Sequence, residues 1–168
     1  PDQPEDTALA LLLGACFQAT RRILAITPYF VLDDGLRDAL RLAARRGVEV
    51  TLIIPHKSNH RLADFVRTRA MRDLAQAGVH FRMLPFMAHA KALVLDDTLA
   101  LCGSINIDLR SLLINHEASV VFYGPADIAW LADWITQTAS SAQPYVATPP
   151  GLGRDVAEGL VQAVAFQL

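Results

Sequence analysis

The sequence predicts an α/β fold in which a central sheet is buried between layers of helices. The apolar run at 23–26 and the mainly apolar segments at 48–54 and 79–84 are short enough for strands, and segments with helical spacing lie between them. Strands that alternate with helices in this way usually run parallel, with the helices on the faces of the sheet. A hydrophobic share of 52% and a mean hydropathy of +0.28 agree with a sheet that is buried on both sides.

Three helices are expected in the first half of the chain. Apolar side chains recur at helical spacing over residues 7–20. Asp33 or Asp34 can cap a second helix that continues through residue 46, and Gly47 can end it. A third helix is expected over about residues 60–77, with a buried stripe formed by Leu62, Phe65, Val66 and Leu74.

After Pro85 the strand signals follow one another with short connections. Strands are expected at 90–95, 99–102 and 118–123, and Asp96-Asp97 favours a hairpin between the first two. This part of the sheet is therefore expected to lack the long helical crossovers of the first half.

The last third of the chain is expected to be mainly helical. Pro125 can start a helix that reaches about residue 141, the Pro/Gly-rich segment 143–153 is interpreted as a loop, and 155–168 as a final amphipathic helix. Trp130 and Trp134 are four residues apart on the first of these helices. That spacing fits either the flank of the core or contact with a membrane interface.

The composition limits the environment and the partners of the chain. A net charge of -2 and a pI of about 6.2 show no basic excess, so a nucleic-acid partner is not expected. Cys16 and Cys102 lie in apolar surroundings without metal-ligand spacing, which favours free thiols in a reducing compartment. The sequence contains no apolar run of about 18 residues, so no membrane span is predicted. We expect a cytoplasmic protein. Because the chain begins at Pro1, we expect it to be a piece of a longer protein.

Residues that can hold and attack a phosphate gather between His89 and Glu117. His89 and Lys91 are two residues apart, so on a strand their side chains would leave by the same face. Ser104 and Asn106 repeat this spacing after the next apolar run and offer neutral hydrogen bonds. Glu117 opens a third apolar run and needs a partner there, for which His89 is the obvious candidate. The ends of three strands should bring these groups to one edge of the sheet.

These residues form a recognisable signature. His89-x-Lys91-x4-Asp96, followed by Gly103-Ser104-x-Asn106, resembles the HKD motif of the phospholipase D superfamily. The extension Asp108-x-Arg110-Ser111-x3-Asn115-x-Glu117 and the earlier Thr27-Pro28-Tyr29-Phe30 are similar to the C-terminal half of bacterial cardiolipin synthases. The resemblance implies one phospholipase D-like domain over residues 1–168, the C-terminal half of a chain with two HKD motifs. It also implies an α/β/α sandwich whose mixed sheet is mainly parallel.

The resemblance also implies roles for the site residues. His89 would attack phosphorus and form a phosphohistidine, Lys91 would supply fixed positive charge, and Glu117 would hold the imidazole proton. Ser104 and Asn106 would orient the phosphate oxygens. Asp96 is counted among the catalytic residues because it belongs to the motif. However, Asp96 is an odd number of residues from His89, so on a strand the two side chains would leave by opposite faces. This favours a role for Asp96 in a structural hydrogen-bond network. The alternative is that Asp96 simply forms a turn.

The expected function is phosphatidyl transfer between phospholipids without a metal or another cofactor. His56, His60, His80 and His116 have no mutual metal-ligand spacing. The expected partners are a phospholipid at the inner membrane surface, approached peripherally, and a second HKD half that supplies the other proton carrier. Two alternatives stay open: a homodimeric single-HKD phosphodiesterase or nuclease, and a catalytically silent half that binds lipid or a protein partner. Asp108 and Arg110 are interpreted as a local ion pair.

Overall fold

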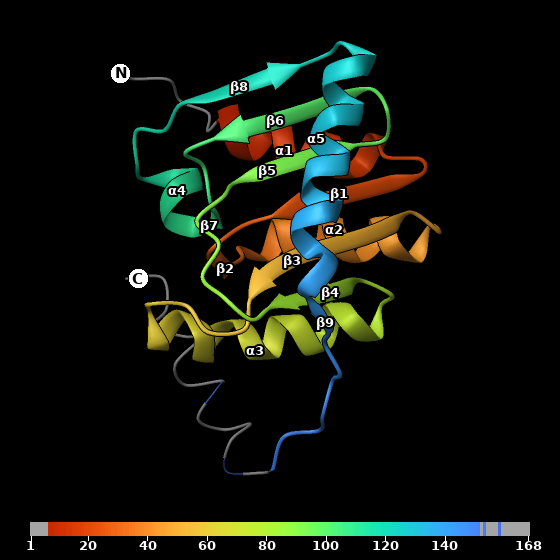
Figure 1. Ribbon diagram of the computed structural model, residues 1–168. Coiled ribbons are helices and arrows are strands. Elements are labelled where there is room, and N and C mark those ends of the chain that lie inside the picture. The colour runs from red at the N-terminus through yellow and green to blue at the C-terminus, as the bar shows by residue number, and fades with distance from the viewer. Residues whose placement is uncertain (1–6, 152, 154–157, 159–168) are drawn as a thin grey trace.

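A computed structural model describes residues 7–151, 153 and 158 of the chain. Its main sheet has the strand order β8-β6-β5-β1-β3-β4-β9 (Figure 1). The strands are β1 (Arg22–Ile26), β3 (Glu49–Pro55), β4 (His80–Leu84), β5 (Ala92–Leu95), β6 (Leu99–Gly103), β8 (Ser119–Phe122) and β9 (Gln143–Pro144). The helices are α1 (Thr7–Gln18), α2 (Asp34–Arg45), α3 (Arg61–Gln76), α4 (Leu109–Leu113) and α5 (Pro125–Thr138), followed by a 3-10 turn at Ala139–Ser141.

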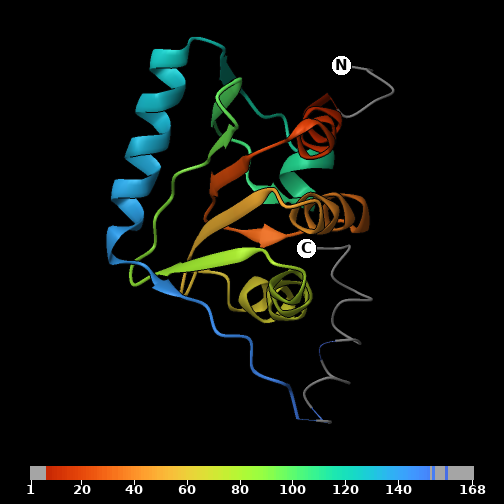
Figure 2. The same ribbon diagram turned by 90° about the vertical axis from the view of Figure 1, so that its right-hand side faces the viewer.

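The sheet lies between two helical layers, as expected. In Figure 2, α5 covers one face and α1, α2 and α3 cover the other. The strand β3 shows how the sequence produces both contacts: Val50, Leu52 and Ile54 pack in the core on the α1–α3 side, and Ile53 packs in the core under α5. Successive side chains of a strand point to opposite faces, so one strand contributes to two cores.

The balance of strand directions differs from the expectation. Within the described main sheet, the β1–β3 and β3–β4 pairs are parallel, whereas β1–β5, β5–β6, β6–β8 and β4–β9 are antiparallel. The predicted mixed α/β/α sandwich is confirmed, but its description as mainly parallel is wrong. The physical reason is the length of the connections. Parallel neighbours need a crossover of a dozen or more residues, and the three-residue turn between β5 and β6 permits only an antiparallel hairpin.

The predicted ends of α2 are confirmed, whereas α1, expected over residues 7–20, ends at Gln18. Asp33 is the N-cap of α2, and its side chain accepts a hydrogen bond of 2.8 Å from the backbone N–H of Leu36. Gly47 follows that helix with φ 91°, a left-handed conformation that glycine adopts without strain. Both cysteines are free, and burial raises the pKa of the Cys16 thiol to about 12.

Several details were not predicted correctly. Leu62 was expected in the buried stripe of α3 but is 47% exposed. Trp130 is 67% exposed, because α5 turns Ile128, Leu131 and Ile135 to the core instead. The loop predicted at 143–153 contains the short strand β9, which pairs with β4. The helix predicted at 155–168 lies outside the described residues except at Glu158, a buried carboxylate that binds the guanidinium of Arg72 at 2.5 and 3.3 Å.

A second, two-stranded sheet was also missed. It joins β2 (Phe30–Val31) to β7 (Ile107–Asp108) in parallel, and so ties the segment after β1 to the segment after β6. Among the described residues, no helix is both long enough and apolar enough to cross a membrane.

Candidate active site

The predicted site residues other than Asp96 converge on one end of the strands of the main sheet. The strand register places Ile26 opposite Ala92, Ala92 opposite Cys102, and Gly103 opposite Ser119. The start of β5, the end of β6 and the start of β8 therefore lie side by side. His89 and Lys91 precede the first, Ser104 follows the second, and Glu117 precedes the third. The convergence expected from the sequence is confirmed.

His89 and Lys91 lie in the extended segment before β5 and not on the strand itself, which begins at Ala92. The Lys91 Nζ turns back and donates a hydrogen bond of 3.1 Å to the carbonyl oxygen of His89. The imidazole of His89 is exposed, and its ring meets the edge of Tyr29 with 6.1 Å between ring centroids. The ammonium is therefore held against the backbone of the histidine, while the imidazole is open to a substrate.

Two opposing effects act on the ammonium of Lys91. Partial burial lowers its pKa, and the carboxylates of Glu117 and Asp108 partly oppose this by raising it. The net shift is downward. A charge that is partly removed from water interacts more strongly with a phosphate than a fully solvated one.

Ser104 and Glu117 are joined by hydrogen bonds across the strand ends. The Ser104 hydroxyl donates to Glu117 Oε2 and accepts a hydrogen bond of 3.0 Å from the backbone N–H of Ala118. Gly103 makes this close approach possible, because a Cβ there would lie 2.3 Å from the carbonyl oxygen of Ala118. A side chain at position 103 would therefore push the end of β6 away from the start of β8.

The expected pairing of Glu117 with His89 is not present between these two described residues. The carboxylate accepts instead from Ser104 and from Asn115 Nδ2, the latter at 3.1 Å. Burial would raise the pKa of Glu117, but hydrogen bonds from Ser104, Asn115 and Ser111 and the charge of Lys91 outweigh it and lower the pKa. Glu117 is thus a stable anion that organises hydroxyl groups beside Lys91.

The hydrogen bonds of Asn106 differ from its expected role, which was to orient a phosphate oxygen. Its Nδ2 donates a hydrogen bond of 2.9 Å to the hydroxyl of Ser111, and its buried Oδ1 has no partner among the described residues. Asp108 caps α4 by accepting from the backbone N–H of Ser111 at 2.7 Å. The predicted Asp108–Arg110 ion pair is not formed. Arg110 instead donates to Asn115 over 3.4 Å.

Thr27 and Tyr29 are site residues for which only the family resemblance was an indication. The buried Thr27 hydroxyl accepts from the backbone N–H of Ile107 at 3.1 Å and donates to the carbonyl oxygen of Tyr29 at 2.9 Å. It therefore fixes the turn that presents Tyr29 to His89. The only signal in the sequence is their place directly after the apolar run of β1.

The loop between β3 and α3 reaches Tyr29 from the other side. Asn59 Oδ1 accepts a hydrogen bond of 2.6 Å from the Tyr29 hydroxyl. The loop is held by the buried Arg67 of α3, whose Nη2 donates to the carbonyl oxygens of Pro55 and His56 at 2.9 and 3.0 Å. Asp64 completes this arrangement by pairing with Arg67 at 3.0 Å and accepting from the backbone N–H of Ser58 at 2.8 Å.

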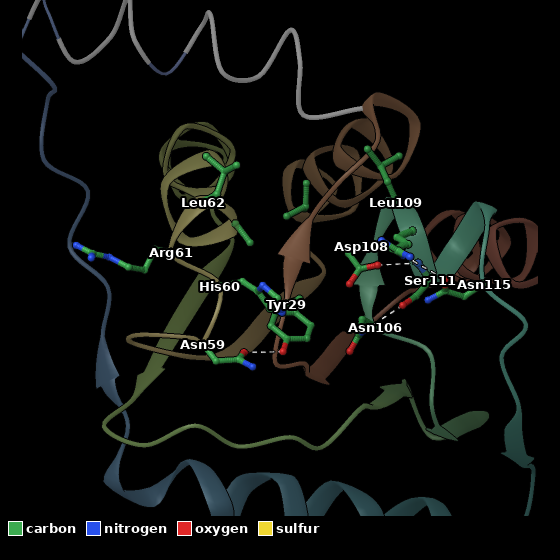
Figure 3. Close-up of a pocket in the computed structure, with 13 residues that line it drawn as sticks. Tyr29, Asn59, His60, Arg61, Leu62, Asn106, Asp108, Leu109, Ser111 and Asn115 are labelled. Atoms are coloured by element: carbon green, nitrogen blue, oxygen red, sulfur yellow. Dashed lines mark hydrogen bonds between the residues drawn. The ribbon is translucent and has the colours of Figure 1, made fainter. Parts of the chain in front are cut away.

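A pocket of about 480 Å³ lies next to these groups (Figure 3). Residues 59–63, at the end of the β3–α3 loop and the start of α3, form one wall. Asn106, residues 108–111 and Asn115 form the other, and Tyr29 lies between them. The ring of His60 packs against the ring of Tyr29 with 5.2 Å between their centroids, and the ring of Tyr29 also contacts that of His89.

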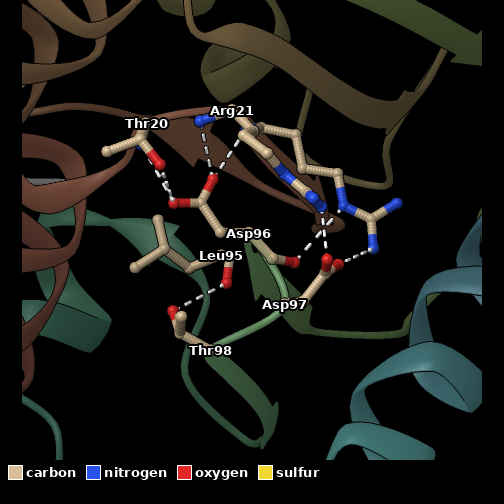
Figure 4. Close-up of polar contacts among 7 residues, drawn as sticks. Thr20, Arg21, Leu95, Asp96, Asp97 and Thr98 are labelled. Atoms are coloured by element: carbon tan, nitrogen blue, oxygen red, sulfur yellow. Dashed lines mark hydrogen bonds and ion pairs between the residues drawn. The ribbon is translucent and has the colours of Figure 1, made fainter.

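Asp96 lies at the opposite end of β5, away from the other motif residues (Figure 4). Its buried carboxylate accepts hydrogen bonds from the backbone N–H groups of Thr20, Arg21 and Arg22 at 2.8–2.9 Å and from the Thr20 hydroxyl at 3.0 Å. Burial would raise the pKa of Asp96, but these hydrogen bonds outweigh it and lower the pKa. The contacts are those of a structural clamp between the β5–β6 turn and the start of β1.

The fold and the site define a phospholipase D-type domain. The chain superposes with a TM-score of 0.74 on the phospholipase D family member Nuc from Salmonella typhimurium, at 25% identity, covering 85% of this chain and 93% of that one. A phosphatidylserine synthase from Haemophilus influenzae shares the fold with a TM-score of 0.71 at 15% identity, covering 94% of this chain and 43% of that one.

The sequence narrows the class further. Residues 13–139 match the family described as "Cardiolipin synthase, PLD-like domain", and the chain belongs to this family. It is 35% identical over 122 residues to cardiolipin synthase A of Pectobacterium carotovorum subsp. carotovorum and 36% identical over 122 residues to that of Pseudomonas entomophila. These matches cover 72% of this chain but only 25% and 26% of the relatives, so the chain spans about a quarter of their length. The resemblance expected from the sequence is confirmed.

Proposed function

We propose that this domain is the catalytic C-terminal half of a cardiolipin synthase-like phosphatidyltransferase. The observation that carries the proposal is the placement of Lys91. Its ammonium is held 3.1 Å from the carbonyl oxygen of the exposed His89, beside the anionic Glu117 network. The family matches support phospholipids as the substrate class. The site would work on lipid headgroups at the inner membrane surface, with the domain bound peripherally.

In the proposed reaction, a neutral ring nitrogen of His89 attacks the phosphorus of a phosphatidyl donor. The bond from phosphorus to the leaving alcohol breaks, the alcohol takes up a proton, and the phosphatidyl group stays on His89. A hydroxyl of a second lipid then attacks phosphorus and gives up its proton, and the bond to His89 breaks. Lys91 offsets the charge on the phosphate oxygens, and Glu117 favours the charged form of Lys91. A glycerol hydroxyl as acceptor would yield cardiolipin.

The reaction needs a second group that carries a proton to the leaving alcohol. The described residues contain a single His-x-Lys pair, His89 and Lys91. We therefore assign the second proton carrier to another HKD half, upstream in a longer chain or in a second copy. The benefit of such general acid–base help is typically ~10²–10⁴-fold, so the isolated domain should be slow on natural lipids.

A substrate with a better leaving group separates the role of His89 from that of the missing half. 4-Nitrophenolate leaves without being protonated, so a radiolabelled phosphatidyl-4-nitrophenol should load the domain on its own. The expected result is a burst of nitrophenolate close to one equivalent and label on the protein that is labile to acid and stable to base. The His89→Ala variant should give neither. The matched control is His80→Ala, because His80 is an exposed histidine at the opposite end of the parallel strand β4. Label retained by the His89→Ala variant at the wild-type level would refute the assignment.

A second candidate function is a phosphodiesterase built from two copies of a single-HKD chain. The observation that favours it is the extent of the match to Nuc, 93% of whose chain is covered. The two functions differ in the acceptor that removes the group from His89. Transfer to an added alcohol in preference to water supports the transferase. Hydrolysis that rises with dimer concentration and ignores added alcohol supports the phosphodiesterase.

A further inference from the structure

We propose that the pocket beside Tyr29 binds the hydroxyl-bearing head of the acceptor alcohol. This inference deepens the proposed transferase function and rests on it, because it assigns the place from which the second substrate reaches His89. The volume of about 480 Å³ falls within the range of about 300–1,000 Å³ that is usual for small-molecule sites.

The pocket lies where the acceptor alcohol would bind before the transfer step. Tyr29 forms part of its wall, and the same ring meets the imidazole of His89 edge-on at 6.1 Å. A hydroxyl group held on the pocket side of Tyr29 therefore has a short path to a phosphatidyl group on His89. The Tyr29 ring cannot swing freely across this path, because its hydroxyl is bonded to Asn59 and its face meets the ring of His60 (Figure 3).

The hydrogen bonds behind the pocket fix which atoms its inner wall presents. The Ser111 hydroxyl oxygen accepts a hydrogen bond of 2.9 Å from Nδ2 of Asn106. This contact orients the carboxamide with Oδ1 turned away from Ser111, toward the Tyr29 side in Figure 3.

The inner wall is consequently short of hydrogen-bond donors. The Asn106 Oδ1 is buried and has no partner among the described residues, which is an unusual state for a carbonyl oxygen. Asp108, also in the wall, adds a carboxylate. These groups would repel a phosphate and favour a ligand that donates hydrogen bonds, as an alcohol does. Val31, Leu62 and Leu109 supply apolar surface for its carbon atoms.

The rim of the pocket has the opposite character. Arg110 lines it, and its side chain is exposed. Arg61 belongs to the opposite wall, but Figure 3 shows its guanidinium directed away from Tyr29. An acceptor that carries hydroxyls at one end and a phosphate at the other would place the hydroxyls inward and the phosphate at Arg110. The pocket therefore fits a hydroxylated phospholipid head better than a simple aliphatic alcohol.

The test is the partition of the phosphatidyl group between alcohol and water. It uses the active enzyme with both HKD halves, a phosphatidyl donor, and glycerol as the acceptor probe. Ala63→Trp fills the pocket from the α3 side, and Gln76→Trp places the same ring at the exposed far end of α3 as the matched control. We expect the glycerol concentration for half-maximal transfer to rise about tenfold or more in Ala63→Trp, as for the loss of a buried hydrogen bond. Hydrolysis of the donor should stay within about twofold of wild type, a change that corresponds to less than half a kcal/mol.

An NMR measurement and a second pocket variant distinguish failure of the inference from failure of the proposed function. Saturation-transfer NMR with glycerol should show contact with the wild-type protein and the Gln76→Trp control and lose it in Ala63→Trp, whether or not the enzyme turns over. Leu62→Trp, at a partly exposed position of the same wall, serves if Ala63→Trp does not fold. Normal donor hydrolysis with unchanged glycerol dependence in the pocket variants would overturn the inference and leave the proposed function standing. Absence of phosphatidyl chemistry in the wild type, with glycerol contact still lost on filling, would overturn the function instead.

Discussion

Replacement of Asp96 by asparagine should destabilise the fold and leave the chemistry at His89 intact. Asparagine tolerates the left-handed backbone of this position, where φ is 48°, so the turn itself is not strained by the change. What changes is the set of acceptors offered to the start of β1. The carboxylate accepts four hydrogen bonds, three of them from backbone N–H groups.

The magnitude follows from those contacts. A carboxamide keeps one acceptor oxygen and turns its NH2 toward at least one backbone N–H, and an unpaired buried donor costs about 1–3 kcal/mol. The remaining bonds lose their ionic acceptor, at about 1 kcal/mol each. The sum is about 3–5 kcal/mol, a large part of the total of about 5–15 kcal/mol for a domain. The melting temperature should fall by about 10 °C, since each kcal/mol corresponds to about 2–4 °C at this chain length.

Urea unfolding of the variant measures the loss directly, and pH adds a second criterion. Asp96 has a folded-state pKa below the unfolded value, so its stabilising effect is present above about pH 4 and disappears as the pH falls through the folded-state pKa. The difference between wild type and the Asp96→Asn variant should therefore shrink in acid.

The matched control is Asp97→Asn, one residue away. Asp97 forms ion pairs with Arg21 and Arg22 but is exposed, and such pairs are worth about 0–1 kcal/mol. An Asp96→Asn variant with an unchanged urea midpoint and no nitrophenolate burst would show that Asp96 acts in the chemistry, and would refute the structural assignment.

Two other perturbations test the site edge. Glu117→Gln removes the carboxylate that raises the pKa of Lys91, so the alkaline limb of the pH profile of kcat/KM should move to lower pH; an alkaline limb at the wild-type position would separate Glu117 from Lys91. Arg67→Met leaves Asp64 and two loop carbonyls without their buried partner and should cost about 3–5 kcal/mol in urea unfolding, as is usual when one member of a buried pair is removed. Thr68→Val, on the same helix, is its control, and a loss as large in both variants would argue against a specific clamp.

The main elements were predictable because their signals are long or chemically distinctive. The run 48–54 is mainly apolar, and residues 52–54 of the strand that it forms are buried on both faces. Asp33 and Gly47 mark the ends of α2 by capping chemistry that acts within a few residues. The two-residue strands β2, β7 and β9 are too short to show any periodicity, and they exist only because partner strands lie beside them.

The site was predictable in composition but not in its contacts. The order of strand ends fixes which residues meet at the edge, and the sequence contains that order. It does not contain the choice among nearby partners. Glu117 accepts hydrogen bonds from Ser104 and Asn115, and the close approach of Gly103 to Ala118 brings Ser104 beside the start of β8. The parity of Asp96 relative to His89 did indicate a different environment, and the structure places it at the far end of the same strand.

The separation of Asp96 from His89 by the full length of β5 has a consequence for protein engineering. The residues that seal the hairpin to β1 lie at one end of the strands, and the loop between β3 and α3 that lines the acceptor pocket lies at the other. A library that randomises residues 59–63 therefore leaves the Asp96 contacts untouched. New acceptor preferences could be selected at the end of that loop and the first turn of α3, while Arg67 continues to anchor the first residues of the loop.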